Sequence, residues 1–101
     1  MAKGYIIFTE KVNDQAALDA YAMKAVGTIF GHSGSPIVVA DSHDVIEGTW
    51  DSERTIVLEF PSVEAAKAWY TSPEYQAVVG ERHAAADCNA VIVGGFEMPG
   101  S

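Results

Sequence analysis

Charged side chains that could transfer protons lie among aromatic residues between positions 47 and 82. The first candidate is Glu59, a carboxylate in a largely apolar strand predicted over residues 54–60. If Glu59 faces a cleft between a sheet and its helices, loss of hydration raises its pKa and makes it a usable base. The alternative, which we favour, is a structural ion pair or hydrogen bond with Arg54 or Arg82, because structural pairs also perturb carboxylates.

Two loop histidines, His32 and His43, are further candidates for catalytic proton transfer. Histidine titrates near neutral pH and is also a common metal ligand. Both lie in polar loop sequence, where histidines are mostly solvated. His43, Asp44 and Glu47 could together hold a metal, but no pair of histidines at helical ligand spacing supports such a site. We therefore expect no metal.

Four side chains are candidates for binding a small ligand: Tyr21, Trp69, Tyr75 and Arg82. Arg82 shares a helical stripe with Tyr75 and so should point inward. A partly buried arginine needs a partner. It either anchors a substrate carboxylate or closes an internal salt bridge, most simply with Glu59 or Glu47, and we favour the internal partner. Most of the aromatic residues should pack in the core, while a few could line an apolar pocket with their polar tips.

Composition limits the classes of partner and chemistry. A chain of 101 residues predicts one domain over 1–101, and its net charge of −8 disfavours nucleic acid and anionic membranes. No apolar run approaches the roughly 18 residues of a membrane helix, and the start of the chain lacks a hydrophobic signal core, so we expect a cytoplasmic protein. The single cysteine, Cys88, excludes an intramolecular disulfide. No nucleotide-binding or nucleophile motif is present, and we expect no cofactor.

The elements that would position these side chains follow the order strand, helix, strand, strand, helical pair, strand. Apolar, β-rich runs predict the strands, at residues 4–9, 37–41, 54–60 and 90–96, with 45–50 in extended form. Residues 97–101 should form a loose tail.

Serine, asparagine and aspartate residues mark the expected helix starts. Asn13 or Asp14 should cap a first helix that ends by Gly31. Ser62 and Ser72 should each cap a later helix, the second with proline at its first position. The second helical element of the fold is therefore expected to be split in two.

This element order fits the split βαβ arrangement of an α+β ferredoxin-like domain, βαββαβ, whose helices cover one face of an antiparallel sheet. Several of the predicted strands are apolar on both faces. A bare face of this kind would exceed the apolar patch that a monomer tolerates. We therefore expect a homodimer in which two sheets pack face to face as a dimeric α+β barrel.

Several motifs resemble those of the domain of unknown function 1330 family. They are Glu47-Gly48-x-Trp50, the 54–60 strand followed by Pro61-Ser62, the string Ala68-Trp69-Tyr70-x-Ser72-Pro73-Glu74-Tyr75-Gln76, and Arg82. The resemblance covers nearly the whole chain and implies a dimeric α+β barrel with a ferredoxin-like protomer, but almost nothing about a reaction. Members typically carry Gly-Gly-Arg after the first helix and Arg-Gly after the second strand. This chain lacks both basic groups and has His32 and His43 nearby instead.

The predicted function is a cofactor-independent small-molecule site in an uncharacterised protein, with proton-transfer or oxygenase- or isomerase-like chemistry. Similar barrels host monooxygenases and isomerases, which is an analogy of fold only. The alternative is a non-catalytic module that binds a metabolite or a protein partner. Catalysis predicts that Glu59, Arg82 and a histidine surround one solvent-reachable pocket. A binding or structural role predicts that these charges pair off with no cavity between them.

Overall fold

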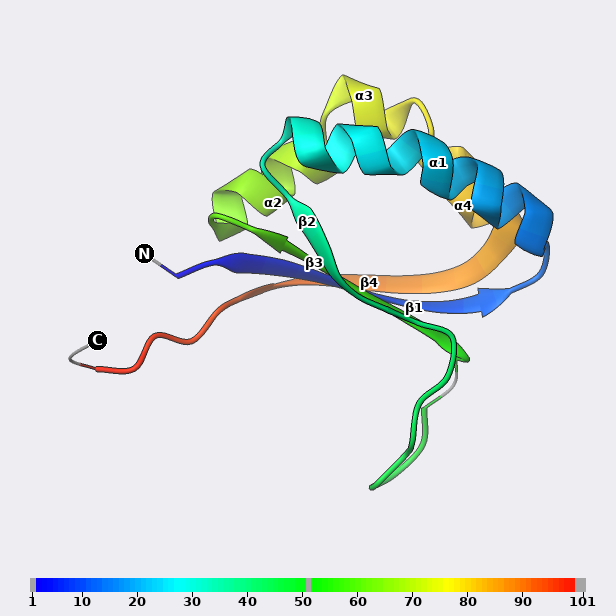
Figure 1. Cartoon of the computed structure of the whole chain (residues 1–101), viewed down its shortest axis with the longest axis horizontal. Coiled ribbons are helices and arrows are strands. Elements are labelled where there is room, and N and C mark those ends of the chain that lie inside the picture. Colours follow the sequence, from blue (N-terminus) through cyan, green and yellow to red (C-terminus); the bar gives the residue numbers. More distant parts are fainter. Residues whose placement is uncertain (1, 51, 100–101) are drawn as a thin grey trace.

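An antiparallel sheet with helices on one of its faces forms the fold (Figure 1). The computed structural model describes residues 2–50 and 52–99. The strands are β1 (Gly4–Val12), β2 (Ser35–Ala40), β3 (Arg54–Phe60) and β4 (Ala86–Gly94), in the spatial order β2-β3-β1-β4. The central strand β1 pairs antiparallel with both β3 and β4. The predicted ferredoxin-like α+β fold is therefore confirmed.

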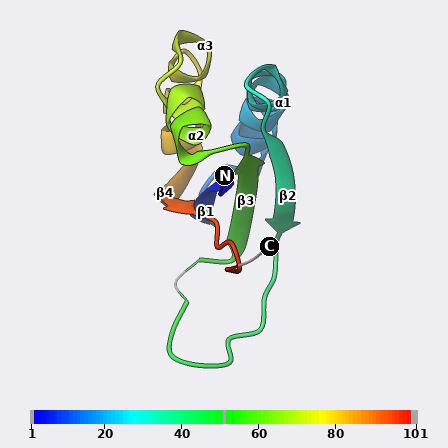
Figure 2. The ribbon, with the colours of Figure 1, turned by 90° about the vertical axis from the view of Figure 1, so that its left-hand side faces the viewer.

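The helices lie in two rows above the sheet, α1 on one side and the later helices on the other (Figure 2). Their bounds are α1 (Gln15–Gly31), α2 (Val63–Tyr70), α3 (Pro73–Gln76) and α4 (Val79–Ala85). Their predicted caps are confirmed, because Asp14, Ser62 and Ser72 each accept a backbone N–H from the first turn of their helix. No helix of the described chain is long and apolar enough to cross a membrane.

The expected second helix of the pair is interrupted. A turn at Ala77 and Val78 separates α3 from α4, and the Val78 N–H bonds to the Tyr75 carbonyl there. No side chain caps α4. The split helical element thus has three parts, and the turn between α3 and α4 sets the direction in which α4 and its Arg82 approach the sheet.

Strand bounds and loop structure differ from the sequence-based expectation in a few places. β4 begins at Ala86, earlier than expected, because it pairs with β1 along its full length from Val12↔Ala86 to Gly4↔Gly94. Residues 45–50 belong to no strand and form part of an exposed loop that leaves the sheet on the side away from the helices (Figure 1). Of the tail expected over 97–101, residues 97–99 belong to no helix or strand, and residues 100 and 101 lie outside the described residues.

The two faces of the sheet carry different side chains. Ile6, Phe8, Leu58 and Phe60 point toward the helices and are buried. The opposite face carries an apolar row across the sheet, because Ile7 lies opposite both Val57 and Val91, and Val57 also lies opposite Val38. Val91 is 53% exposed. This open face has the apolar character that the sequence predicted for it.

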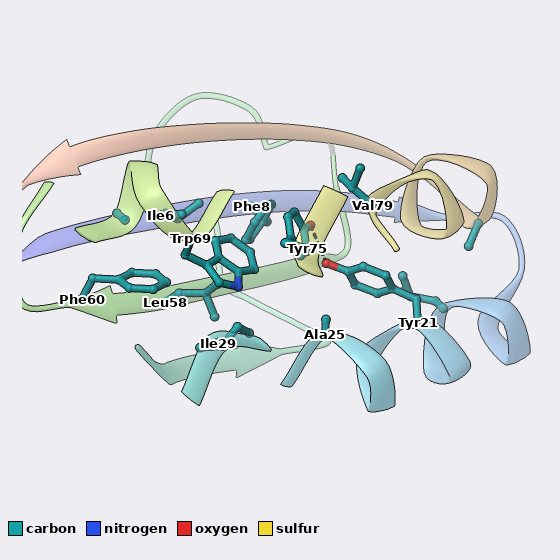
Figure 3. Close-up of a cluster of buried hydrophobic side chains, with 13 residues drawn as sticks. Ile6, Phe8, Tyr21, Ala25, Ile29, Leu58, Phe60, Trp69, Tyr75 and Val79 are labelled. Carbon is teal, nitrogen blue, oxygen red and sulfur yellow. Dashed lines mark hydrogen bonds between the residues drawn. The ribbon is translucent and has the colours of Figure 1, made fainter. Parts of the chain in front are cut away.

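Aromatic side chains fill one end of the layer between helices and sheet (Figure 3). The Trp69 ring lies 4.0 Å from the Tyr75 ring and 5.6 Å from the Phe60 ring, measured between centroids. The Trp69 indole N–H donates to the Thr28 hydroxyl on α1 at 3.0 Å. These contacts join α1, α2, α3 and β3 into one core.

Candidate functional site

A cavity of about 480 Å³ lies between α1 and the sheet. Apolar side chains form most of its wall: Phe8, Ala22, Ala25, Val26, Ile29, Ile56 and Leu58. The exposed members of the lining, among them Met23 of α1 and Val39 of the edge strand β2, place its mouth between α1 and β2. Its size falls within the range of roughly 300–1,000 Å³ that small-molecule sites occupy.

Glu10, Arg54 and Arg82 bring charge to one end of this cavity. β1 and β3 place Glu10 and Arg54 directly opposite each other, and α4 carries Arg82 above them. The Glu10 side chain is 1% exposed, and its Oε1 lies 3.1 Å from Nε of Arg54. These two atoms are at ion-pair distance but make no well-directed hydrogen bond. Arg54 Nη1 also donates to the carboxylate of Asp41, at the protein surface, at 2.6 Å.

Arg82 is a buried cation with incomplete pairing. It is 2% exposed, and its guanidinium carbon lies 4.4 Å from the centroid of the Phe8 ring. Its Nη2 is 3.3 Å from Nε2 of the neighbouring His83. Its Nε and Nη1 have no hydrogen-bond partner among the residues that the structure describes. Buried polar groups are normally satisfied, so these free donors need an explanation.

Burial sets the electrostatics of this cluster. It raises the pKa of Glu10 above the usual range of a carboxylic acid, and the positive charges of Arg54 and Arg82 only partly oppose that effect. Burial also raises the pKa of Tyr21 and of Tyr75. Both tyrosines therefore remain neutral, and their hydroxyl oxygens share a hydrogen bond of 2.6 Å. The cavity thus presents a desolvated carboxylate, two guanidinium groups and a phenol hydroxyl.

The four predicted ligand-binding residues divide into two groups. Arg82 and Tyr21 line the cavity. Tyr75 and Trp69 are fully buried in the aromatic core, and Tyr75 reaches the site only through its hydrogen bond to Tyr21 (Figure 3). The structure therefore brings Tyr21 and Arg82 together and places Trp69 in the scaffold.

Glu59 lies on the open face of the sheet, away from the cavity. Its carboxylate accepts hydrogen bonds from Lys3 Nζ at 3.2 Å and from the Tyr5 hydroxyl at 3.1 Å. Glu59 therefore makes the structural ion pair and hydrogen bond that we favoured, but the suggested partners Arg54 and Arg82 are wrong. Alternation along β3 explains the error, because Arg54 points toward the helices and Glu59 points to the opposite face.

The two predicted catalytic histidines are also remote from the cavity. His32 follows the end of α1, with its Nε2 3.7 Å from a carboxylate oxygen of Glu74. His43 lies in the exposed loop after β2, where its ring meets the edge of Trp50 at 6.1 Å between centroids. Neither histidine lines the cavity. Within residues 2–50 and 52–99, no group of three or more acidic, histidine or cysteine side chains is arranged to hold a metal ion.

Glu10 is the site residue that the sequence analysis missed. The first strand was expected to end at Thr9, whereas β1 continues to Val12. The signal was present in the alternation, because Glu10 continues the inward series of Ile6 and Phe8. A carboxylate at an inward position next to an inward-facing Arg54 on the neighbouring strand predicts a buried ion pair.

Solved structures of low sequence identity share this fold. A protein of unknown function from Rhodopseudomonas palustris has a TM-score of 0.78 at 16% identity, covering 96% of this chain and 85% of that chain. A dimeric ferredoxin-like protein of unknown function from Jannaschia sp. CCS1 has a TM-score of 0.64 at 15% identity, covering 90% and 97%. SnoaB, a cofactor-independent oxygenase from Streptomyces nogalater, has a TM-score of 0.67 at 7% identity, covering 98% of each chain. At these identities the similarity shows the fold alone.

Sequence comparison gives the family. No curated protein matches this chain. The family model described as "Domain of unknown function (DUF1330)" matches residues 3–96, a range that contains the whole cavity and its charged end. The chain therefore belongs to the DUF1330 family.

Proposed function

We propose that the cavity beneath α1 is a cofactor-independent small-molecule site in which Glu10 transfers a proton to or from the bound ligand. The observation that carries this proposal is the position of a buried carboxylate at the charged end of a cavity of ligand size whose remaining wall is largely apolar. General bases require contact with the ligand and a pKa near the working pH. Glu10 lines the cavity, and burial shifts its pKa upward, toward neutral pH.

The neighbours of Glu10 suit this role. Arg54, at 3.1 Å, restrains the carboxylate, and Asp41 restrains Arg54 in turn. Removing a proton from carbon next to a carbonyl leaves negative charge on an oxygen, and a preorganised cation in a water-poor site stabilises that charge. Arg82 is such a cation. Tyr21 adds a hydroxyl whose orientation is held by Tyr75.

The structural comparisons support the type of chemistry without defining the substrate. SnoaB, which shares the fold, is a cofactor-independent oxygenase. An oxygenase that lacks a cofactor must activate the substrate itself, and deprotonation is the simplest way for side chains to do so. Catalytic roles for Glu59, His32 and His43 remain predictions, which their positions outside the cavity do not favour.

Hydrogen–deuterium exchange at carbon tests this function without knowledge of the natural substrate. Neutral and carboxylate-bearing bicyclic ketones with acidic C–H bonds would be incubated with the protein in D₂O and followed by NMR. We expect the protein to accelerate exchange in at least one ketone, and Glu10→Gln to lower the accelerated rate by about a hundredfold or more.

Glu59→Gln is the matched control, because it makes the same chemical change on the opposite face of the sheet. It should leave the exchange rate unchanged. If Glu59→Gln abolishes exchange while Glu10→Gln does not, the assignment of the base is wrong and Glu59 replaces Glu10. Binding of the ketones without any accelerated exchange would overturn the catalytic role and leave a non-catalytic binding module.

We also propose that a second copy of the chain covers the open face of the sheet. The row formed by Val38, Val57, Ile7 and Val91 gives that face an apolar centre, and the similar protein from Jannaschia sp. CCS1 is dimeric. Val91→Asp would place a charge in the centre of the interface. Sedimentation velocity should then change from a dimer to a monomer, whereas a wild-type monomer would overturn this proposal.

A further inference from the structure

Arg82 lines the cavity, and two of its buried donors, Nε and Nη1, have no hydrogen-bond partner among the described residues. We propose that the cavity selects ligands that carry one planar oxyanion, most simply a carboxylate, on an apolar body, and that Arg82 binds the oxyanion. This inference rests on the proposed function of the cavity and adds the chemical class of its ligand. It is independent of whether Glu10 performs catalysis.

The burial of Arg82 is the first argument. A guanidinium group carries five N–H donors and no acceptor, so only acceptors can satisfy it. At 2% exposure, Arg82 has little access to solvent water. One donor nitrogen lies near His83 and one face lies on the Phe8 ring, which leaves Nε and Nη1 without partners among the described residues. A ligand acceptor in the cavity would satisfy them.

The pairing of the charged groups in the cluster is the second argument. Arg54 and Arg82 are positive, while Glu10 is the one carboxylate buried beside them among the described residues. Asp41 neutralises Arg54 from the surface. Asp19 also borders the cavity, but it is exposed and accepts a hydrogen bond from Gln15 at 2.8 Å. Glu10 lies at ion-pair distance from Arg54, whereas no carboxylate among the described residues lies at ion-pair distance from Arg82, whose Nε and Nη1 stay free for a ligand.

The shape of the group selects a planar oxyanion. Guanidinium and carboxylate are both planar, and their charge-assisted hydrogen bonds are shorter and stronger than those between neutral groups. A neutral carbonyl could accept from the same nitrogens but would form weaker hydrogen bonds than a carboxylate. Away from the polar end, α1 and β3 present Val26, Ile29, Ile56 and Leu58, which requires an apolar body. Aromatic acids and medium-chain aliphatic acids have this combination.

Naphthoate and its neutral analogue naphthamide form a matched pair of probes. They share size and shape and differ in charge at the group that would meet Arg82. Isothermal titration calorimetry of the wild-type protein at neutral pH should show naphthoate binding about tenfold or more tightly than naphthamide. In Arg82→Met, which removes the cation at similar volume, the two affinities should become equal within about twofold.

Two further variants separate this effect from general changes in charge. Arg82→Lys keeps the charge but loses the planar fork, and should give an intermediate preference. Lys24→Met removes a cation from the exposed surface of α1, where Lys24 pairs with Glu81, and should keep the full preference. An Arg82→Met protein that retains the preference, or a Lys24→Met protein that loses it, would overturn the assignment to Arg82.

The possible outcomes distinguish this inference from the proposed function. If both probes bind the wild-type protein equally, the cavity remains a ligand site and its selectivity for anions is overturned. If neither probe binds, both proposals are overturned. Should Arg82→Met fail to fold, the NMR signal of the Arg82 Nε–H in the wild-type protein provides the answer. It should shift with naphthoate and not with naphthamide, and an unshifted signal would contradict the inference.

Discussion

The two ends of the layer between helices and sheet are built in opposite ways. At one end, Phe60, Trp69 and Tyr75 fill the space with stacked rings (Figure 3). At the other end, the short side chains of Ala22 and Ala25 on α1 line the cavity. We call these regions the packed end and the hollow end. The packed end is filled by large rings on α2, α3 and β3, whereas α1 contributes small side chains to the hollow end.

The packed end stabilises the fold, whereas the hollow end carries the groups that suit a function. The packed end buries apolar surface, which stabilises the folded chain. The hollow end buries Glu10 and Arg82, each of which would be easier to accommodate in water. Ionisable groups whose pKa is shifted by burial, as that of Glu10 is, cluster at functional sites. The hydrogen bond between Tyr21 and Tyr75 joins the two ends.

The largest effect should come from opening the packed end. Trp69→Ala removes a fully buried ring that contacts Phe60 and Tyr75, and should lower the free energy of unfolding by about 3–5 kcal/mol. Val26→Ala at the mouth of the hollow end should cost less than about 1 kcal/mol, because part of this side chain already faces empty space. Urea unfolding followed by far-UV circular dichroism measures both. Equal losses would show that the hollow end is packed in solution.

The junction between the two ends should show an intermediate effect. Tyr75→Phe leaves the buried Tyr21 hydroxyl without its partner and should cost about 1–3 kcal/mol. The double variant Tyr21→Phe/Tyr75→Phe removes both hydroxyls and should cost less than the sum of the two single variants. A double-mutant cycle from urea unfolding measures the difference. Additive costs would indicate that the hydroxyls do not bond in solution.

The hollow end should give the protein a characteristic pH dependence. The pKa of Glu10 is raised above its ordinary value of 4.5, so the folded state holds this proton more tightly than the unfolded state. The stabilising contribution is therefore fully present below that ordinary value and is lost as the pH rises through the folded-state pKa. A single proton limits the slope to about 1.4 kcal/mol per pH unit.

Glu10→Gln removes this titration and isolates its contribution. Urea unfolding of the wild-type and variant proteins from acidic to neutral pH should show that the wild-type protein loses stability relative to the variant as the pH rises. The other carboxylates are common to both proteins, so they cancel in the difference. Parallel curves would contradict the raised pKa and remove one argument for Glu10 as the base.

Much of the fold could be predicted because its signals are local. Asp14, Ser62 and Ser72 mark the starts of helices through hydrogen bonds within one turn, and alternation along β3 correctly separates Ile56 and Leu58 from Glu59. The interruption between α3 and α4 was missed, because the stripe from Tyr75 to Arg82 is compatible with a continuous helix. The start of β4 was predicted too late for a different reason. Its first residues are held by pairing with β1, which is a contact between parts of the chain far apart in sequence.

The site was harder to predict than the fold because it depends on which elements meet. Arg82 and Tyr21 were identified from their inward positions on helices. Glu59 was chosen because it stands in a largely apolar strand, and Glu10 was not considered because the first strand was expected to end at Thr9. Of the two carboxylates, Glu10 is the one that lines the cavity. The cavity could not be predicted, because residues from α1, α4 and three strands line it together and no single stretch of sequence shows that these elements meet.

Filling the hollow end should have the smallest effect on stability and a clear effect on binding. Ala22→Leu extends an apolar side chain from α1 into the cavity, and should change the free energy of unfolding by less than about 1 kcal/mol, because the gain in burial offsets the loss of freedom. Ala20 and Ala22 are both exposed on α1, but only Ala22 lines the cavity, so Ala20→Leu is the matched control. Calorimetry should show weaker naphthoate binding for Ala22→Leu alone. If both variants weaken binding equally, the ligand binds elsewhere, and the hollow end is a packing defect rather than a site.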